Sequence, residues 1–184
     1  MRTGWVALVA LAACGDDPKP IEPTANLARE IVDTKLSFDV TAKTGTAAIT
    51  FAPSTEPGAS LEVGDLSIDP LAIGGEYLAS AQTGAQLDLA LPASTEAITV
   101  DVSFRYNFHE GFEGASSKGF TLFWPYYCGN LFPCHSQPAD GTTFSLDLAG
   151  IADGKTAVFP PSIESEAPSY QIAWSIGDYT QLDL

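Results

Sequence analysis

The protein has 184 residues, with 8 Lys or Arg against 23 Asp or Glu, so its formal charge is −15. This charge argues against binding to nucleic acid, which needs basic side chains on the phosphates, and against attachment to an anionic membrane by charge alone. Hydrophobic residues make up 45% of the chain, which at this length predicts one folded domain with at most a tail and excludes a disordered acidic chain.

The N-terminus has the pattern of a bacterial export signal. Arg2 precedes an apolar run from Trp5 to Ala13, and Cys14 follows directly. The segment Leu11–Cys14 resembles the lipobox of bacterial lipoproteins, which implies a signal peptide over residues 1–13 and a lipid on Cys14. An ordinary short signal peptide is the alternative. No apolar run reaches the about 20 residues of a membrane-spanning helix, so we expect the lipid to be the only membrane attachment, in the bacterial cell envelope, facing the periplasm or the surface.

A flexible tether is expected over residues 14–29. Pro18, Pro20 and Pro23 lie in this stretch, which has no apolar periodicity. Proline-rich segments of this kind adopt extended conformations and act as spacers. The folded domain is therefore expected over residues 30–184.

From Ile31 onward the apolar residues recur at every second position, which predicts β-strands. In the first strand, one face would carry Val32, Thr34, Leu36, Phe38 and Val40. Further strands are expected at residues 46–51, 61–68 with a bulge near Gly64, 76–81, 86–91, 97–106, 142–148, 155–159 and 170–176. About nine short strands separated by turn residues predict an all-β fold, an antiparallel sandwich or saddle-like sheet assembly.

Residues 104–138 differ from the rest of the chain, because they are rich in aromatic residues and glycine and too irregular to be strands throughout. Long aromatic loops on a β scaffold commonly carry binding surfaces. The alternative is that these rings close an open end of the core.

Two segments resemble catalytic motifs but lack their spacing. His109–Glu113 starts like the zinc motif H-E-x-x-H, yet Glu113 occupies the position of the second histidine. Gly150–Thr156 is one residue short of a P-loop and is predicted to be a turn. We therefore assign no catalytic residue, no metal ligand and no cofactor, although a pair of carboxylates acting as acid and base stays open.

The two cysteines that follow Cys14 are Cys128 and Cys134, an even pair in a chain with an export signal. Exported proteins commonly form disulfides, so we expect these two to be joined. The alternative is metal ligation by two thiolates, for which no further ligands lie nearby in the sequence.

Three segments resemble, in order, the N-terminal domain of the aminopeptidase N and leukotriene hydrolase family of zinc metallopeptidases. Lys43–Phe51 is similar to a G-x-hydrophobic-x-I-x-F strand of that domain. Leu131–Ala139, followed by Thr143–Leu148, resembles its F-P-C segment and the next strand, and Pro168–Tyr179 resembles its closing strand. The resemblance implies a saddle-like β-domain that packs on a catalytic domain, which carries the zinc ligands, and that helps to shape the substrate cleft there.

The substrate-facing residues of the family have no counterparts of the same kind in this chain. Leu122 and Trp124 stand where the aminopeptidase branch has glutamine and glutamate, and Ser136 and Gln137 stand where it has acidic residues. Neither Leu122 nor Trp124 can hold an amino terminus by charge. Substrate-anchoring roles therefore do not transfer to this chain.

The first hypothesis is an exported, lipid-anchored and non-catalytic module that docks on the catalytic domain of a metallopeptidase or shapes its substrate site, as part of a split or truncated peptidase. A surface facing such a partner is expected to be apolar and exposed. The candidate residues for this docking surface are Phe120, Phe123, Trp124, Tyr126 and Tyr127. The alternative is a free-standing adhesion or binding module for peptide or glycan, and a hydrolase that uses unassigned carboxylates is a weaker third hypothesis.

Overall fold

The computed structural model describes residues 20–180. Fifteen strands and two short 3₁₀ helices make up this part, which confirms the all-β, sandwich-like fold class. The predicted signal peptide (residues 1–13), the lipid site Cys14 and the start of the tether lie outside the described residues. Neither helix in the described part is long and apolar enough to cross a membrane.

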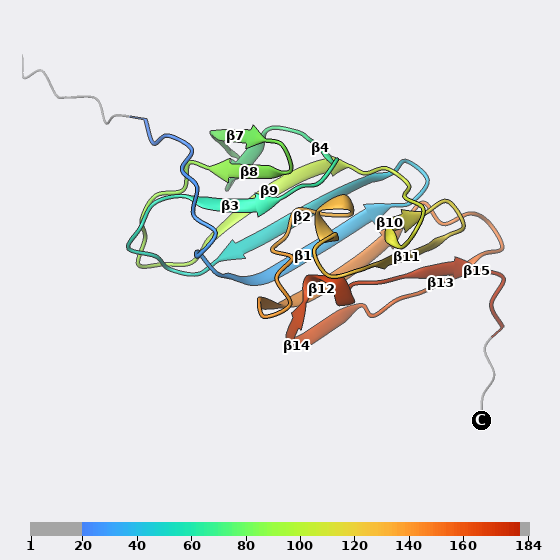
Figure 1. Ribbon diagram of the computed structural model, residues 1–184. Helices are drawn as coiled ribbons and strands as arrows, with labels where there is room; N and C mark the ends of the chain where they lie inside the picture. The colour runs from blue at the N-terminus through green and yellow to red at the C-terminus, as the bar shows by residue number, and fades with distance from the viewer. Residues whose placement is uncertain (1–19, 181–184) are drawn as a thin grey trace, which may run out of the picture.

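The largest sheet forms the frame of the molecule (Figure 1). Its order is β14-β12-β1-β2-β9-β5-β6, and β4 also pairs with β9. Neighbouring strands are antiparallel, except that β1 and β12 run parallel. The strands are β1 (Ile31–Asp39), β2 (Thr44–Phe51), β4 (Ser67–Ile68), β5 (Leu71–Ile73), β6 (Glu76–Leu78), β9 (Ile98–Arg105), β12 (Gly141–Ala149) and β14 (Ser162–Pro168).

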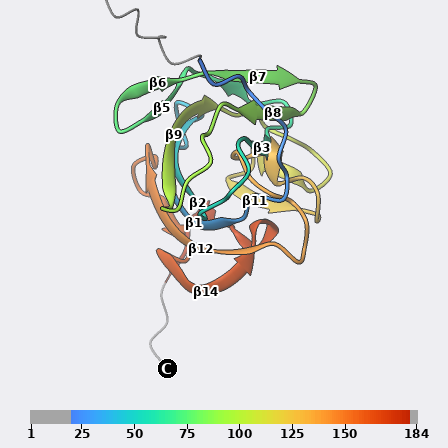
Figure 2. The same cartoon turned by 90° about the vertical axis from the view of Figure 1, so that its left-hand side faces the viewer.

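Two smaller sheets complete the fold. One has the order β3-β8-β7, and the other has the order β10-β11-β15-β13. Figure 2 shows the large sheet curving from β9 through β2 and β1 to β12 and β14, with β3, β8 and β11 on its inner side. The elements are β3 (Ala59–Glu62), β7 (Ser80–Thr83), β8 (Gln86–Leu89), β10 (Glu113–Ser116), β11 (Phe120–Phe123), β13 (Thr156–Val158), β15 (Ser175–Gly177), η1 (Cys128–Asn130) and η2 (Ser169–Gln171).

The core lies against the inner face of the large sheet and follows the predicted alternation. Along β2 and β9 the buried residues alternate with more exposed ones, and the register pairs Ile49 with Val100. Phe38 packs at the centre of an aromatic group, with ring centroids 5.8 Å from Phe104, 5.8 Å from Tyr106 and 4.8 Å from Trp174. Burial of such rings is the main favourable contribution to folding.

The first strand differs in one detail from the expected alternation. The pairing of β1 with β2 skips Val32, because a bulge lies between Ile31 and Asp33. Ile31 is therefore buried and Val32 is exposed, so Val32 does not share the inner face with Leu36 and Phe38. A bulge adds one residue to a strand and shifts the residues before it to the opposite face.

Several element boundaries were predicted wrongly. The stretch 61–68 is two short strands separated by a turn, and 170–176 is mostly η2 and loop rather than a strand. Strands β5, β10, β11 and β14 were not predicted. Each of them is short or irregular in its alternation, so pairing with neighbouring strands decides their structure more than local sequence does.

The last residues assigned to the tether pack on the domain. Thr24 forms a β-bridge with Leu89, and the backbone N–H of Asn26 donates to the Ser60 hydroxyl over 2.9 Å. The Arg29 guanidinium is buried and donates from Nη1 to the carbonyl oxygen of Pro92 over 2.9 Å. Burial lowers the pKa of Arg29. The contacts of the domain thus extend back to residue 24.

Strongly alkaline pH is expected to destabilise the fold through Tyr106. Burial, and then the Asp39 carboxylate, raise the pKa of Tyr106 from 10.0 to about 12. The folded state therefore holds this proton more tightly, so the contribution is complete below the unfolded pKa and is lost as the pH rises through the folded pKa. We expect a loss of about 2 kcal/mol in the free energy of unfolding across that interval. Urea unfolding at several alkaline pH values measures this loss. Tyr106→Phe should make the free energy of unfolding less dependent on pH. An unchanged pH dependence in that variant would contradict the assignment.

Candidate functional site

The aromatic region is built on the β10–β11 hairpin. Gly114 pairs with Leu122 and Glu113 pairs with Phe123. Successive side chains of a strand point to opposite faces. Thr121 and Phe123 are therefore buried, whereas Leu122 and Trp124 face outward.

This alternation corrects one of the predicted docking residues. Phe123 is only 3% exposed and belongs to the core, so it cannot contact a partner. Trp124 and Tyr126 are each 60% exposed, Tyr127 is exposed as well, and Phe120 is half-buried. Strand alternation along residues 121–124 would have predicted that Phe123 is buried between the exposed Leu122 and Trp124.

Two further apolar side chains join the exposed residues. Phe112 and Leu122 are exposed, and the backbone N–H of Trp124 donates to the carbonyl of Phe112 over 3.2 Å. Phe112, Phe120 and Leu122 also line one shallow pocket of about 130 Å³. The aromatic surface is defined from here on as Phe112, Phe120, Leu122, Trp124, Tyr126 and Tyr127.

The backbone holds two of these rings in an unfavourable conformation. Phe112 has a φ of 66° and Tyr126 a φ of 77°, and Lys43 is the one other non-glycine residue with positive φ in the described part. A bulky side chain in this region costs roughly 1–2 kcal/mol. Such strain persists where the surrounding structure imposes it, and it is concentrated at functional sites.

A disulfide anchors the segment that follows the aromatic surface. Cys128 and Cys134 are joined, with their Cα atoms 6.3 Å apart, and both are buried, which confirms the predicted pair. Cys134 also forms a two-way backbone bridge with Glu62 in β3, with N···O distances of 2.8 and 3.1 Å. The loop after Tyr127 is thereby fixed to the neighbouring sheet.

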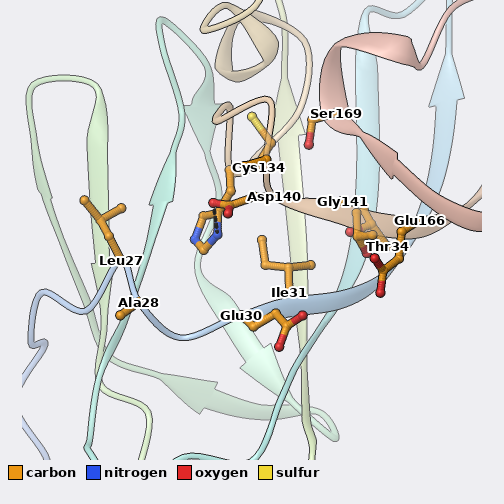
Figure 3. A pocket seen from close by; sticks show the side chains of 13 residues that line it. Leu27, Ala28, Glu30, Ile31, Thr34, Cys134, Asp140, Gly141, Glu166 and Ser169 are labelled. Atoms are coloured by element: carbon orange, nitrogen blue, oxygen red, sulfur yellow. Dashed lines mark ion pairs between the residues drawn. The ribbon is translucent and has the colours of Figure 1, made fainter.

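A separate cavity of about 320 Å³ lies beside His135. Figure 3 shows the acidic residues Glu30, Asp140 and Glu166 around it. The His135 Nε2 lies 2.8 Å from the Ser60 carbonyl oxygen, which can only accept, so this nitrogen carries a proton. Its Nδ1 faces the Asp140 carboxylate at 3.8 Å. The cavity therefore presents mainly negative charge.

The segment that resembles a zinc motif does not form a metal centre. His109 lies in a loop before β10, and its Nε2 is 3.2 Å from a carboxylate oxygen of Asp65. The amide of Asn107 donates to the same carboxylate over 2.9 Å. Within residues 20–180, no three side chains of His, Cys, Asp or Glu lie close enough together to hold a metal ion. Residues 153–154 of the P-loop-like segment form a turn between β12 and β13, as predicted.

Several solved structures have a fold similar to that of this chain. An M1 zinc metallopeptidase from Deinococcus radiodurans matches with a TM-score of 0.66 and 14% identity, over 80% of this chain and 42% of that one. Legionella pneumophila aminopeptidase A, in complex with aspartic acid, matches with a TM-score of 0.69 and 13% identity, over 83% and 22%. Yeast LTA4 hydrolase, in complex with Bestatin, matches with a TM-score of 0.63 and 16% identity, over 84% and 29%.

The fold is that of the N-terminal region of M1 aminopeptidases. The chain spans 22–42% of the length of the peptidase chains that it matches. No protein-family model matches the chain, and no curated protein matches it. At such low identity the chain shares only the fold with these enzymes, and its activity and partners have to be argued from its own residues.

Proposed function

We propose that this protein is a lipid-anchored, non-catalytic module that packs through its aromatic surface on the catalytic domain of a zinc metallopeptidase. The observation that carries the proposal is the fold match, which covers most of this chain but well under half of each peptidase. One matched enzyme is described as a two domain M1 zinc metallopeptidase. A module with this fold therefore has a catalytic domain as its natural neighbour.

The aromatic surface has the chemistry of an interface core. Tryptophan and tyrosine supply large contact areas and dominate the binding energy of many interfaces. Trp124, Tyr126 and Tyr127 follow one another within four positions, and Leu122 and Phe112 lie beside them. Contact with a partner would remove these apolar rings from water, and their burial would contribute favourably to the free energy of binding.

The strained backbone supports the same role. Phe112 and Tyr126 keep their rings outward in a conformation that glycine would adopt at lower cost. A purely structural turn has no need of an aromatic side chain at these positions. We infer that the exposed rings are retained for contact with the catalytic domain.

The substrate-shaping part of the role follows from Leu122 and Trp124. By the sequence resemblance, these two occupy the positions that face substrate in the aminopeptidase branch. Both side chains are apolar and exposed. They suit apolar contact at the edge of a substrate cleft and do not suit recognition of a charged amino terminus.

Lipid attachment at Cys14 would place the module at the membrane of the bacterial cell envelope. Two or more acyl chains give stable anchoring. Intact-mass measurement of the protein extracted from its host membrane tests this, with Cys14→Ser as the control. An unmodified Cys14, or membrane retention of the Cys14→Ser variant, would refute the anchor.

The docking prediction is tested by affinity purification of the tagged protein from its own host. We expect recovery of zinc and of aminopeptidase activity that a chelator abolishes, while the isolated chain is inactive. Trp124→Ala should reduce the recovered activity about tenfold or more, because a central aromatic anchor is lost. Activity is followed with a fluorogenic aminoacyl amide, and metal by elemental analysis.

Two further variants separate docking from folding. Tyr126→Gly removes a ring while relieving a positive φ, so it should weaken docking without lowering the stability of the domain. Tyr77→Ala removes a ring that is 73% exposed on β6, outside the aromatic surface, and should leave docking unchanged. The proposal fails if no zinc peptidase is recovered, or if Trp124→Ala and Tyr126→Gly both recover the same activity as the wild type.

A further inference from the structure

A pocket of about 180 Å³ lies next to the aromatic surface, since Ser116 in its lining pairs with Phe120, but the two share no residue. It is formed where the β1–β2 turn, the segment after β9, the β10–β11 hairpin, the β12–β13 loop and residues 174–176 meet. The polar and aromatic residues of its lining are Thr41, Tyr106, Phe108, Ser116, Ser117 and Trp174. We call it the Tyr106 pocket.

The Tyr106 hydroxyl is a polar group without a partner at this pocket. The residue is only 2% exposed, and no hydrogen bond of its hydroxyl is found among residues 20–180. In the described part, the one side-chain nitrogen or oxygen that is both fully buried and unpaired belongs to Arg29. Because the Tyr106 oxygen is not among the fully buried unpaired atoms, it keeps a small contact with the pocket that the residue lines, where it can donate to a ligand oxygen.

The remaining polar groups of the pocket also present donors. Ser116 accepts a hydrogen bond from the Lys118 backbone N–H over 3.2 Å, and its own hydroxyl hydrogen has no acceptor among residues 20–180. Ser117 is exposed beside it. The lining contains no charged side chain, and the charges beside Tyr106 and Phe108, the Asp39 carboxylate and the Lys43 ammonium, are of opposite sign, so the pocket favours no ionic ligand of either sign.

Aromatic rings form part of the apolar lining of the pocket. Trp174 is nearly buried and forms part of the wall, whereas Phe108 is 46% exposed and lies at the rim. The Lys43 ammonium lies 5.4 Å from the centroid of the Phe108 ring, a cation–π contact that holds this ring in place. The pocket thus combines aromatic surface with several hydroxyl donors.

We propose that the Tyr106 pocket binds one neutral pyranose ring of a glycan. A pyranose has an apolar face for aromatic contact and hydroxyl oxygens that accept from Tyr106 and Ser116. A purely apolar side chain would leave the Tyr106 hydroxyl desolvated without a partner, which is costly. The volume is below the about 300–1,000 Å³ of sites for drug-sized ligands, so it has room for a single ring.

This inference is independent of the docking proposal, because the two sites have different residues and different ligands. The test is a titration of the full-length chain with methyl pyranosides of glucose, galactose, mannose and N-acetylglucosamine, followed by NMR. At least one should shift the Trp174 indole N–H and the amides of residues 115–119 in a saturable way. For one small ring we expect a Kd on the order of millimolar.

Tyr106→Phe keeps the ring and removes the hydroxyl, so affinity should fall about fivefold or more. Tyr77→Phe makes the same chemical change at an exposed tyrosine outside the pocket and should leave the affinity unchanged. The proposal is overturned if no pyranoside shifts these signals, or if Tyr106→Phe binds as the wild type does. It is overturned equally if toluene binds there and no pyranoside does, since that result would indicate a pocket for an apolar side chain.

Discussion

Phe38→Ala is expected to lower the free energy of unfolding by about 3–5 kcal/mol, a larger loss than removal of the disulfide should cause. Phe38 is almost fully buried, and its ring contacts Phe104, Tyr106 and Trp174. Gly45, opposite it on β2, has no side chain that could fill the space. The variant should leave a cavity at the junction of the large sheet with the sheet that contains β15.

Urea unfolding followed by tryptophan fluorescence measures this loss. Val32→Ala is the matched control, because Val32 lies on the same strand but points to solvent at the bulge. That control should change stability by about 1 kcal/mol or less, since Val32 is 38% exposed and lies outside the core. A loss below about 1.5 kcal/mol for Phe38→Ala would mean that the site collapses around the missing ring, and would contradict the central position assigned to it.

Removal of the disulfide is expected to have the second largest effect on stability. Cys128 and Cys134 close a loop with a sequence separation of 6. Closing a loop of this size restricts the unfolded chain by about 2.4 kcal/mol in the chain-entropy model. The double variant Cys128→Ala/Cys134→Ala should lose about that amount or slightly more, because two buried sulfur atoms are also removed.

Loss of the disulfide should also disturb the aromatic surface, because Tyr127 directly precedes Cys128. Calorimetry with and without a reductant checks the prediction. The reductant should lower the Tm of the wild type and leave the double variant unchanged. Equal thermal unfolding of the wild type in both conditions would show that the bond contributes no stability, and docking by the reduced protein would show that the surface does not depend on it.

The long central strands were predictable because their information is local. Apolar and polar residues alternate without interruption in β9 and nearly so in β2 and β12, so the sequence indicates which face of each strand is buried. The disulfide was predictable for a similar reason, since Cys128 and Cys134 lie six positions apart and the N-terminal pattern predicts export, and such pairs commonly form disulfides in exported proteins. These features need no knowledge of what lies across the core.

The candidate sites could be predicted less well from the sequence. Trp124, Tyr126 and Tyr127 are exposed, as a docking surface requires, but Phe123 was placed wrongly because the β10–β11 pairing was not predicted. The Tyr106 pocket was not predicted at all. Its lining runs from Val40 to Ile176, and no spacing along the chain indicates that these segments meet.

By itself, the sequence determined the all-β class, the principal strands, the cysteine pair and a resemblance to a peptidase domain, because alternation, spacing and short motifs are properties of neighbouring residues. Tertiary structure decided the parallel pairing of β1 with β12, the bulge that turns Val32 outward and the burial of Phe123. It also brought Thr41, Tyr106 and Trp174 to one pocket. The reason is physical: strand pairing and core packing join residues far apart in the chain, and a one-residue change in register reverses which side chains are buried.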